Sequence, residues 1–194
     1  MNQPAALIFD CDGTLADTMP VHFLAWQEAI KPAGLTFDED HFYRLGGVPT
    51  DKIFAMLCEE QNKTADVDKL SQTKEAAYEA LIHQVKPIEA IVAVARENHG
   101  RIPLAVGSGG YRETVISTLK TIGILELFDH IVAAEDTQRH KPEPDVYLRA
   151  AELLGVAPTA CRVYEDTDLG LEAGFRAGMR CFDVRAVHTP KRWT

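Results

Sequence analysis

The feature of this sequence that most constrains its fold is an apolar run, Leu7 to Phe9, that leads directly into two carboxylates and a glycine. An uninterrupted apolar run is typical of a strand buried on both faces, as in a parallel sheet covered by helices. Gly13 permits a tight turn just after this strand. Asp10 and Asp12 stand two positions apart, so on extended backbone their side chains share a face. The stretch therefore predicts a buried strand with two acidic groups at its carboxyl end.

The rest of the chain divides into a helical part and an alternating part. Residues 18–86 contain helical patterns, including a helix over about 20–33, and no strand-like run. Beyond them, apolar runs alternate with helical segments, which is typical of right-handed βαβ units and a parallel sheet. The expected strands there are 102–106, 130–134, 162–164 and 180–184, and the expected helices are 88–98, 113–122, 144–154 and 168–177. We therefore predict an α/β protein whose doubly wound, Rossmann-like parallel-sheet core is formed by residues 1–17 and 87–194, with residues 18–86 inserted as a small all-helical unit.

Composition excludes several classes of function. The formal net charge of −9, from 20 basic and 29 acidic residues, disfavours nonspecific binding to nucleic acid or to an anionic membrane. The sequence shows neither a leader pattern nor an apolar run of about eighteen residues, so we expect a cytoplasmic protein without a membrane span. Its cysteines form no Cys-x-x-Cys pair, which favours structural thiols over a redox or zinc site.

Polar residues that could carry chemistry follow the expected strands. The set consists of Asp10, Asp12, Ser108, Gly109, Glu165 and Asp166, with Lys141 in the loop after the third strand. In doubly wound sheets, ligands bind outside the carboxyl ends of the strands, so these residues are expected at one edge. Carboxylates gathered there would raise one another's pKa values unless a cation neutralised them, and oxygen ligands of this kind suit Mg²⁺, which commonly bridges to phosphate. Backbone amides near a helix start, together with the Ser108 hydroxyl, can seat an anion. Lys141, stiffened by the following proline, can pair with the carboxylates and hold a phosphoryl oxygen.

Taken together, these residues resemble the four motifs of the haloacid dehalogenase superfamily of phosphotransferases, in order and over nearly the whole chain. The matching segments are Asp-x-Asp-Gly-Thr-Leu-x-Asp-Thr at 10–18, the strand end at Ser108, Lys-Pro-x-Pro-Asp at 141–145, and Glu-Asp-Thr-x-x-Gly with Ala-Gly-Met within 165–179. The inserted helical unit is similar to the small cap domain of the beta-phosphoglucomutase-like branch, where His22-Phe23-x-Ala25-Trp26 also matches. Within that branch, residues 45–50, 105–109 and 140–142 look closest to the bacterial fructose-1-phosphatase type.

The resemblance implies a mechanism and a role for each residue. Asp10 would attack phosphorus to form an aspartyl-phosphate, and Asp12 would protonate the leaving sugar oxygen and then deprotonate the hydrolytic water. Mg²⁺ would be held by Asp10, the backbone carbonyl of Asp12 and Asp166, with Glu165 in support. The phosphate and the substrate would be bound by Ser108, Gly109, Lys141, His22 and Thr50; for His22 the alternatives are assistance to Asp12 and simple packing. The expected function is a Mg²⁺-dependent phosphatase acting on a small sugar phosphate of the fructose 1-phosphate kind.

The main alternative is a beta-phosphoglucomutase-type phosphosugar mutase, which must grip a second phosphate with basic cap residues. Thr50 stands where the mutase has a cap arginine, Tyr111 and Arg112 replace its Lys-Asn pair, and Ala80 falls about where its cap lysine would be. These departures disfavour the mutase. A binding module that has lost catalysis is disfavoured too, since every motif position is filled. The sugar and the oligomeric state remain open; we expect a monomer, with a homodimer as the alternative.

Overall fold

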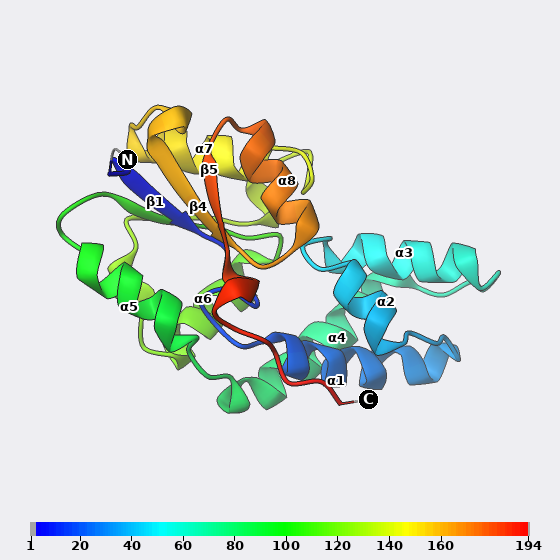
Figure 1. Ribbon diagram of the computed structural model, residues 1–194. Helices are drawn as coiled ribbons and strands as arrows, with labels where there is room; N and C mark the ends of the chain where they lie inside the picture. The colour runs from blue at the N-terminus through cyan, green and yellow to red at the C-terminus, as the bar shows by residue number, and fades with distance from the viewer. Residues whose placement is uncertain (1–2, 194) are drawn as a thin grey trace.

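The computed structural model describes residues 3–193, and its centre is a five-stranded sheet in the order β3-β2-β1-β4-β5 (Figure 1). All neighbouring strands pair in parallel. The strands are β1 (Ala6–Phe9), β2 (Leu104–Gly107), β3 (His130–Val132), β4 (Cys161–Glu165) and β5 (Arg180–Asp183). The chain moves from β1 outward to β3 and then returns to the other side of β1, so the order reverses between β1 and β4. This is the switch point where ligands bind in such sheets, and the predicted doubly wound fold is confirmed.

Helices cover both faces of the sheet, which explains the continuous apolar run of β1. Leu7 and Phe9 pack in one hydrophobic cluster with residues of α5 (Glu89–Asn98) and α6 (Arg112–Thr121). Ala6 and Ile8 belong to a second cluster with residues of α7 (Asp145–Leu154) and α8 (Asp168–Arg176). Figure 1 shows these two helical layers on opposite sides of the strands. The central strand is thus fixed from both faces, and so is the position of the carboxylates that follow it.

Four helices lie beside the carboxyl edge of the sheet: α1 (Met19–Ile30), α2 (Glu39–Arg44), α3 (Thr50–Glu60) and α4 (Val67–Leu81). They share a hydrophobic cluster of their own, in which the rings of Trp26 and Phe54 lie 4.3 Å apart between centroids. We call these helices and their connections the cap. Helix α4 also contacts the core, because the hydroxyls of Tyr78 and Thr118 on α6 are hydrogen-bonded at 2.7 Å. That the cap is a domain in its own right stays a prediction.

Most elements match the predicted ranges to within a residue or two, and proline explains two of the differences. The first cap helix ends at Ile30 and is continued only by a 3₁₀ turn over Lys31–Ala33, because Pro32 lacks the N–H that an α-helix requires. The strand predicted over 102–106 begins at Leu104, since Pro103 cannot donate to a neighbouring strand. The Pro103 carbonyl still accepts from the Leu7 amide at 3.1 Å, so the sheet register is set at this point.

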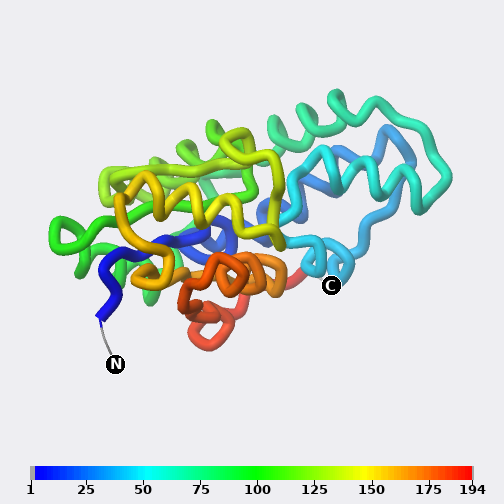
Figure 2. The backbone as a smooth tube through the Cα atoms, turned by 90° about the horizontal axis from the view of Figure 1, so that it is seen from above, coloured from blue at the N-terminus to red at the C-terminus, as the bar shows by residue number. Residues whose placement is uncertain are grey.

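The C-terminal residues form no helix or strand over 188–193 but pack on the cap (Figure 2). The indole nitrogen of Trp193 donates to the Pro20 carbonyl at 3.0 Å, and Arg192 pairs with Asp40 on α2 at 2.5 Å. The chain therefore returns from the last core strand to the first cap helices, a connection that no sequence pattern predicted. Within residues 3–193, no helix has the length and apolar character needed to cross a membrane.

The cap's hydrophobic cluster can be tested by truncating one buried ring. Phe54 is 0% exposed, so Phe54→Ala should lower the free energy of unfolding by about 3–5 kcal/mol, measured by urea denaturation. Phe175 is the matched control, because it is 62% exposed on α8 and its loss leaves no cavity. Equal effects of Phe54→Ala and Phe175→Ala would contradict the packing described here.

Candidate active site

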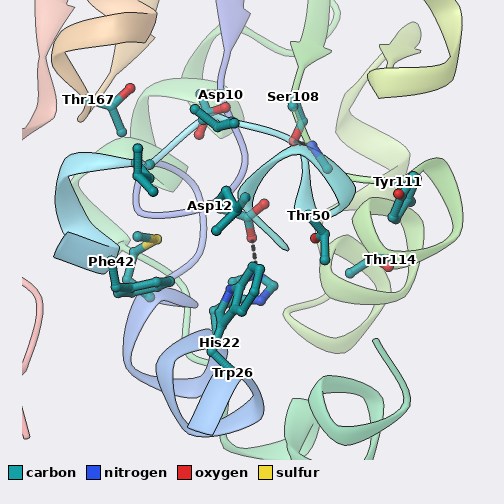
Figure 3. Close-up of a pocket in the computed structure, with 18 of the residues that line it drawn as sticks. Asp10, Asp12, His22, Trp26, Phe42, Thr50, Ser108, Tyr111, Thr114 and Thr167 are labelled. Carbon is teal, nitrogen blue, oxygen red and sulfur yellow. Dashed lines mark hydrogen bonds and ion pairs between the residues drawn. The ribbon is translucent and has the colours of Figure 1, made fainter. Parts of the chain in front are cut away.

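A pocket opens between the carboxyl edge of the sheet and the cap, at the switch point of the sheet (Figure 3). Its core side is lined by the segments that follow β1, β2 and β4, and its cap side by residues from all four cap helices and the loop before α3. Figure 3 shows Asp10, Asp12 and Ser108 on the core side facing His22 and Trp26 of α1, with Thr50, Tyr111 and Thr114 together at one end. The polar residues predicted from separate strand ends therefore meet in one place.

Two residues on the core side of the pocket, Asp10 and Glu165, form a buried ion triad with Lys141. The Lys141 ammonium donates to Oδ1 of Asp10 and to Oε2 of Glu165, both at 2.7 Å, and all three side chains are at most 7% exposed. Burial lowers the pKa of Lys141, but the two carboxylates outweigh it and raise that pKa well above its usual value. Burial raises the pKa of Asp10 to about 8; Lys141 opposes this shift, and the charges of Glu165 and Asp12 add to it. One lysine thus faces two carboxylates, and Asp10 ionises readily at neutral pH only when further positive charge lies beside it.

Glu165 is saturated by donors from the protein itself. Its Oε2 accepts from the Tyr147 hydroxyl at 2.5 Å as well as from Lys141. Its Oε1 accepts from the amides of Asp166 and Thr167 at 3.0 and 2.9 Å, and from the Thr167 hydroxyl at 2.9 Å. Lys141 outweighs burial, so the pKa of Glu165 is lowered. This arrangement gives Glu165 a positioning role, because it fixes both Lys141 and the backbone that presents Asp166.

The residues at this edge fit a divalent cation. Asp10, Glu165 and Asp166 each offer an oxygen, and these oxygens lie within 4.8 Å of one another. The Asp166 carboxylate is oriented by the Thr14 hydroxyl at 2.9 Å, and burial together with the charges of Glu165 and Asp10 raises its pKa well above the usual value. Hard oxygen ligands with uncompensated negative charge suit Mg²⁺. Of the predicted metal ligands, Asp10 and Asp166 lie together; the third was the backbone carbonyl of Asp12, and that assignment stays a prediction.

Asp12 occupies a different environment from Asp10, facing the cap. Nε2 of His22 lies 3.1 Å from Oδ1 of Asp12, and the His22 ring stacks on Tyr78 with centroids 4.0 Å apart. Burial raises the pKa of Asp12, but the interaction with His22 outweighs it and lowers the pKa to about 2. Burial and the nearby charge of Lys74 lower the pKa of His22, which favours a neutral ring that donates its Nε2–H to the carboxylate. The two acidic groups of the opening strand thus differ in partners and in proton affinity.

Glycines bring the cap into contact with the loop after β2. A Cβ on Gly109 would lie 2.5 Å from the Gly47 carbonyl oxygen, so only glycine allows the two loops to approach this closely. Gly47 itself has φ of 86° and lies beside the aliphatic part of Lys141. Ser108 is 1% exposed, and its hydroxyl accepts from the Gly110 amide at 3.0 Å. The loop that could seat an anion is therefore covered by the cap.

Two site residues that sequence reasoning missed come from α4. Lys74 is 4% exposed and donates to Glu75 at 2.9 Å; both side chains line the pocket. Thr50, predicted as a substrate contact, donates to the same Glu75 carboxylate at 3.0 Å. Ala80, which was expected near the position of a cap lysine, is exposed and lies outside the pocket lining. The buried residues of α4 are Leu70, Ser71, Lys74 and Tyr78, which recur at helical spacing. This spacing was the sequence pattern that could have indicated that Lys74 faces inward.

The chain belongs to the haloacid dehalogenase-like hydrolase family, whose pattern matches residues 7–184. The predicted family and the assignment as a hydrolase enzyme are thereby confirmed. Among curated proteins, it is similar to the fructose-1-phosphate phosphatase YqaB of Escherichia coli, with 40% identity over 94% of this chain and 97% of that protein. It is also 29% identical to the beta-phosphoglucomutase of Bacillus subtilis, over 90% of this chain and 80% of that protein. Phosphatases and phosphosugar mutases both occur among its relatives.

Solved structures place the fold in the same group. The structure of CbbY from Rhodobacter sphaeroides in complex with phosphate superposes with a TM-score of 0.83 and 26% identity, covering 92% of this chain and 85% of that one. The beta-phosphoglucomutase structure from Clostridium difficile gives a TM-score of 0.81 and 27% identity, over 92% of this chain and 83% of that one. Over more than nine-tenths of the chain, the fold is therefore arranged as in these two structures.

The ion triad generates a stability prediction. Lys141→Met leaves Glu165 buried without its counter-charge, while Asp10, whose pKa is already raised to about 8, is protonated at pH 7. We therefore expect the free energy of unfolding at pH 7 to fall by about 3 kcal/mol in metal-free buffer. Urea denaturation measures this change. Combining Lys141→Met with Glu165→Gln removes the stranded charge of Glu165, so the double variant should be more stable than Lys141→Met alone. A double variant that is no more stable would contradict the assignment.

Proposed function

We propose that this protein is a Mg²⁺-dependent phosphatase that hydrolyses a small sugar phosphate, with fructose 1-phosphate as the leading candidate, through an aspartyl-phosphate on Asp10. The observation that carries the proposal is the environment of Asp10. One of its oxygens is held by Lys141 at 2.7 Å, at an edge where Asp166 offers a further carboxylate oxygen. The sugar substrate is supported by the name of the Escherichia coli relative, a fructose-1-phosphate phosphatase at 40% identity.

In the first step, an oxygen of Asp10 attacks phosphorus and the bond from phosphorus to the sugar oxygen breaks. Lys141 keeps the Asp10 carboxylate in one orientation and compensates part of its charge. Asp10, the carbonyl of Asp12 and Asp166 would hold Mg²⁺, with Glu165 in support. When bound, Mg²⁺ would offset the charge of the carboxylates and of the phosphoryl oxygens. The Ser108 hydroxyl, the amide of Gly109 and Lys141 would bind those oxygens.

Asp12 would act as the proton shuttle of both steps. Its pKa of about 2 leaves it ionised in the free protein, so it would take up a proton when the charged phosphate of the substrate binds beside it. It then gives this proton to the leaving sugar oxygen and takes one back from the water that attacks the phosphorus of the aspartyl-phosphate. The second attack releases inorganic phosphate and restores Asp10. His22 holds Asp12 through the contact of 3.1 Å and positions it toward the cap side of the pocket, where the sugar would lie. This is the assistance to Asp12 that was one of the two functional roles predicted for His22.

A phosphosugar mutase is the second candidate, and Lys74 is the observation that favours it. This buried lysine supplies a basic cap group that the sequence comparison with the mutase did not identify. The Bacillus subtilis relative is a beta-phosphoglucomutase. We rank hydrolysis first because Lys74 is already paired with Glu75 and because Thr50 adds no positive charge. The other partner assignments, a monomer in the cytoplasm that binds neither nucleic acid nor membranes, stay predictions.

The test is release of inorganic phosphate from a panel of sugar phosphates that includes fructose 1-phosphate, with Mg²⁺ present. Asp10→Asn removes the nucleophile while keeping the size of the side chain, so we expect at least about a thousandfold loss of kcat. Circular dichroism and the melting temperature establish that the variant remains folded.

Two further experiments test the metal requirement and the mutase alternative. Withdrawing Mg²⁺ with a chelator should stop phosphate release by the unaltered protein, and adding Mg²⁺ back should restore it. Substantial turnover by Asp10→Asn would contradict the nucleophile assignment, and turnover that ignores the chelator would contradict the metal. Glucose 6-phosphate formed from beta-glucose 1-phosphate and a bisphosphate primer faster than free phosphate would favour the mutase.

A further inference from the structure

Glu75 lies where the pocket meets a second groove. Glu75, Tyr111 and Thr114 line both hollows, whereas Asp10, Asp12 and Ser108 line only the pocket. In Figure 3, Thr50, Tyr111 and Thr114 lie together to one side of Asp12 and Ser108. The part of a substrate remote from its reacting phosphate would therefore lie against Glu75.

The Glu75 carboxylate is built into the pocket wall by three donors from three helices. Its Oε1 accepts from Lys74 of α4 at 2.9 Å and from Thr50 of α3 at 3.0 Å, and its Oε2 accepts from Thr114 of α6 at 3.0 Å. Burial raises the pKa of Glu75, but Lys74 outweighs it, with His22 adding to the effect, so the pKa is lowered and the group stays ionised. Lys74, with a side chain only 5% exposed, has its positive charge compensated by this neighbour.

The adjoining groove is acidic. Its lining includes the carboxylates of Asp51, Asp68, Glu75, Glu113 and Glu135. Arg112 also lines it, but its guanidinium pairs with Asp136 and donates to the Ile131 carbonyl. The negative surroundings extend to Tyr111, whose pKa is raised by burial and then by Asp51, Glu75 and Glu135. A negatively charged group beyond Glu75 would meet no uncompensated lysine or arginine among the residues that line this groove.

We propose that Glu75 is a specificity-determining residue, which admits sugar monophosphates with hydroxyl groups at the far end and rejects sugars that carry a second phosphate there. The inference rests on the proposed phosphatase function and names the class of substrate for that same site. A sugar hydroxyl can donate to the Glu75 carboxylate, whereas a phosphate dianion has no proton to give and is repelled by it. The Glu75 carboxylate would therefore select substrates mainly by repelling those that carry a second phosphate.

The experiment compares two ligands that differ only in the second phosphate, fructose 1-phosphate and fructose 1,6-bisphosphate. The ratio of their kcat/KM values is measured for the unaltered protein, Glu75→Gln and Glu79→Gln. Glutamine keeps one oxygen for Thr50 and places an amide opposite the Thr114 hydroxyl, which can accept as well as donate. The substitution removes the charge and frees that of Lys74, so the ratio should shift toward the bisphosphate by about tenfold or more. Glu79 is the matched control: it lies on the same helix and bonds Ser117 of α6 across the same interface, but it does not line either hollow.

The expected result is a ratio that shifts in Glu75→Gln, mainly through KM for the bisphosphate, and does not shift in Glu79→Gln. An unchanged ratio in Glu75→Gln, or an equal shift in both variants, would overturn the proposal. Binding of the same two compounds to Asp10→Asn and to Asp10→Asn with Glu75→Gln, measured by calorimetry, gives a second ratio that needs no turnover. Loss of turnover on every monophosphate would contradict the proposed function alone, while the calorimetric ratio would still decide the role of Glu75.

Discussion

The contact on which the rest of the site depends is the buried pairing of Lys141 with Asp10 and Glu165. These three ionisable side chains are buried, so they lose most of their hydration. Burying them is tolerated only when the geometry of close pairing, together with hydrogen bonds, compensates that loss. Here the sheet supplies that geometry, because Asp10 follows the central strand and Glu165 ends the neighbouring one. Glu165 receives enough donors from the protein to act as a fixed anchor, whereas Asp10 lines the pocket with only one of its oxygens held, by Lys141. Burial and neighbouring carboxylates raise the pKa values of Asp10 and Asp166, so their ionisation requires more positive charge than Lys141 supplies, and that need is the physical reason a cation fits beside them.

The core side of the site could be predicted from the sequence because its geometry is local. Asp10, Ser108 and Asp166 each follow a strand within one or two residues, and parallel strands end at a common edge, so knowing the strands places the side chains. The topology followed from the alternation of strands and helices, and the boundaries at Ile30 and Leu104 shifted only where proline removes a donor. The cap side could not be predicted in this way. Lys74 and Glu75 reach the pocket through the packing of α4 against α1 and α6, and Trp193 reaches Pro20 through a tail with no periodic pattern.

The core and cap sides of the pocket have different roles in the proposed function. The reacting end of the pocket is built from strand ends and contains the residues that the family resemblance implied. The selecting end is built from helices of the cap, where Thr50 and Glu75 face Thr114 of the core. The two ends meet where Gly47 lies against Gly109 and where His22 contacts Asp12, so a substrate would be enclosed by both at once. In the proposed function, these contacts connect the core residues that react with the phosphate to the cap residues that select the sugar.

The central claim is that Asp10 becomes covalently phosphorylated. Borohydride reduces an acyl phosphate to an alcohol, so reduction of enzyme quenched during turnover of a sugar phosphate should convert Asp10 to homoserine. Peptide mass spectrometry locates the change. We predict homoserine at position 10 only when substrate is present, with Asp12 and Asp166 unaltered. Steady turnover with no modification at Asp10, or modification at another carboxylate, would contradict the mechanism.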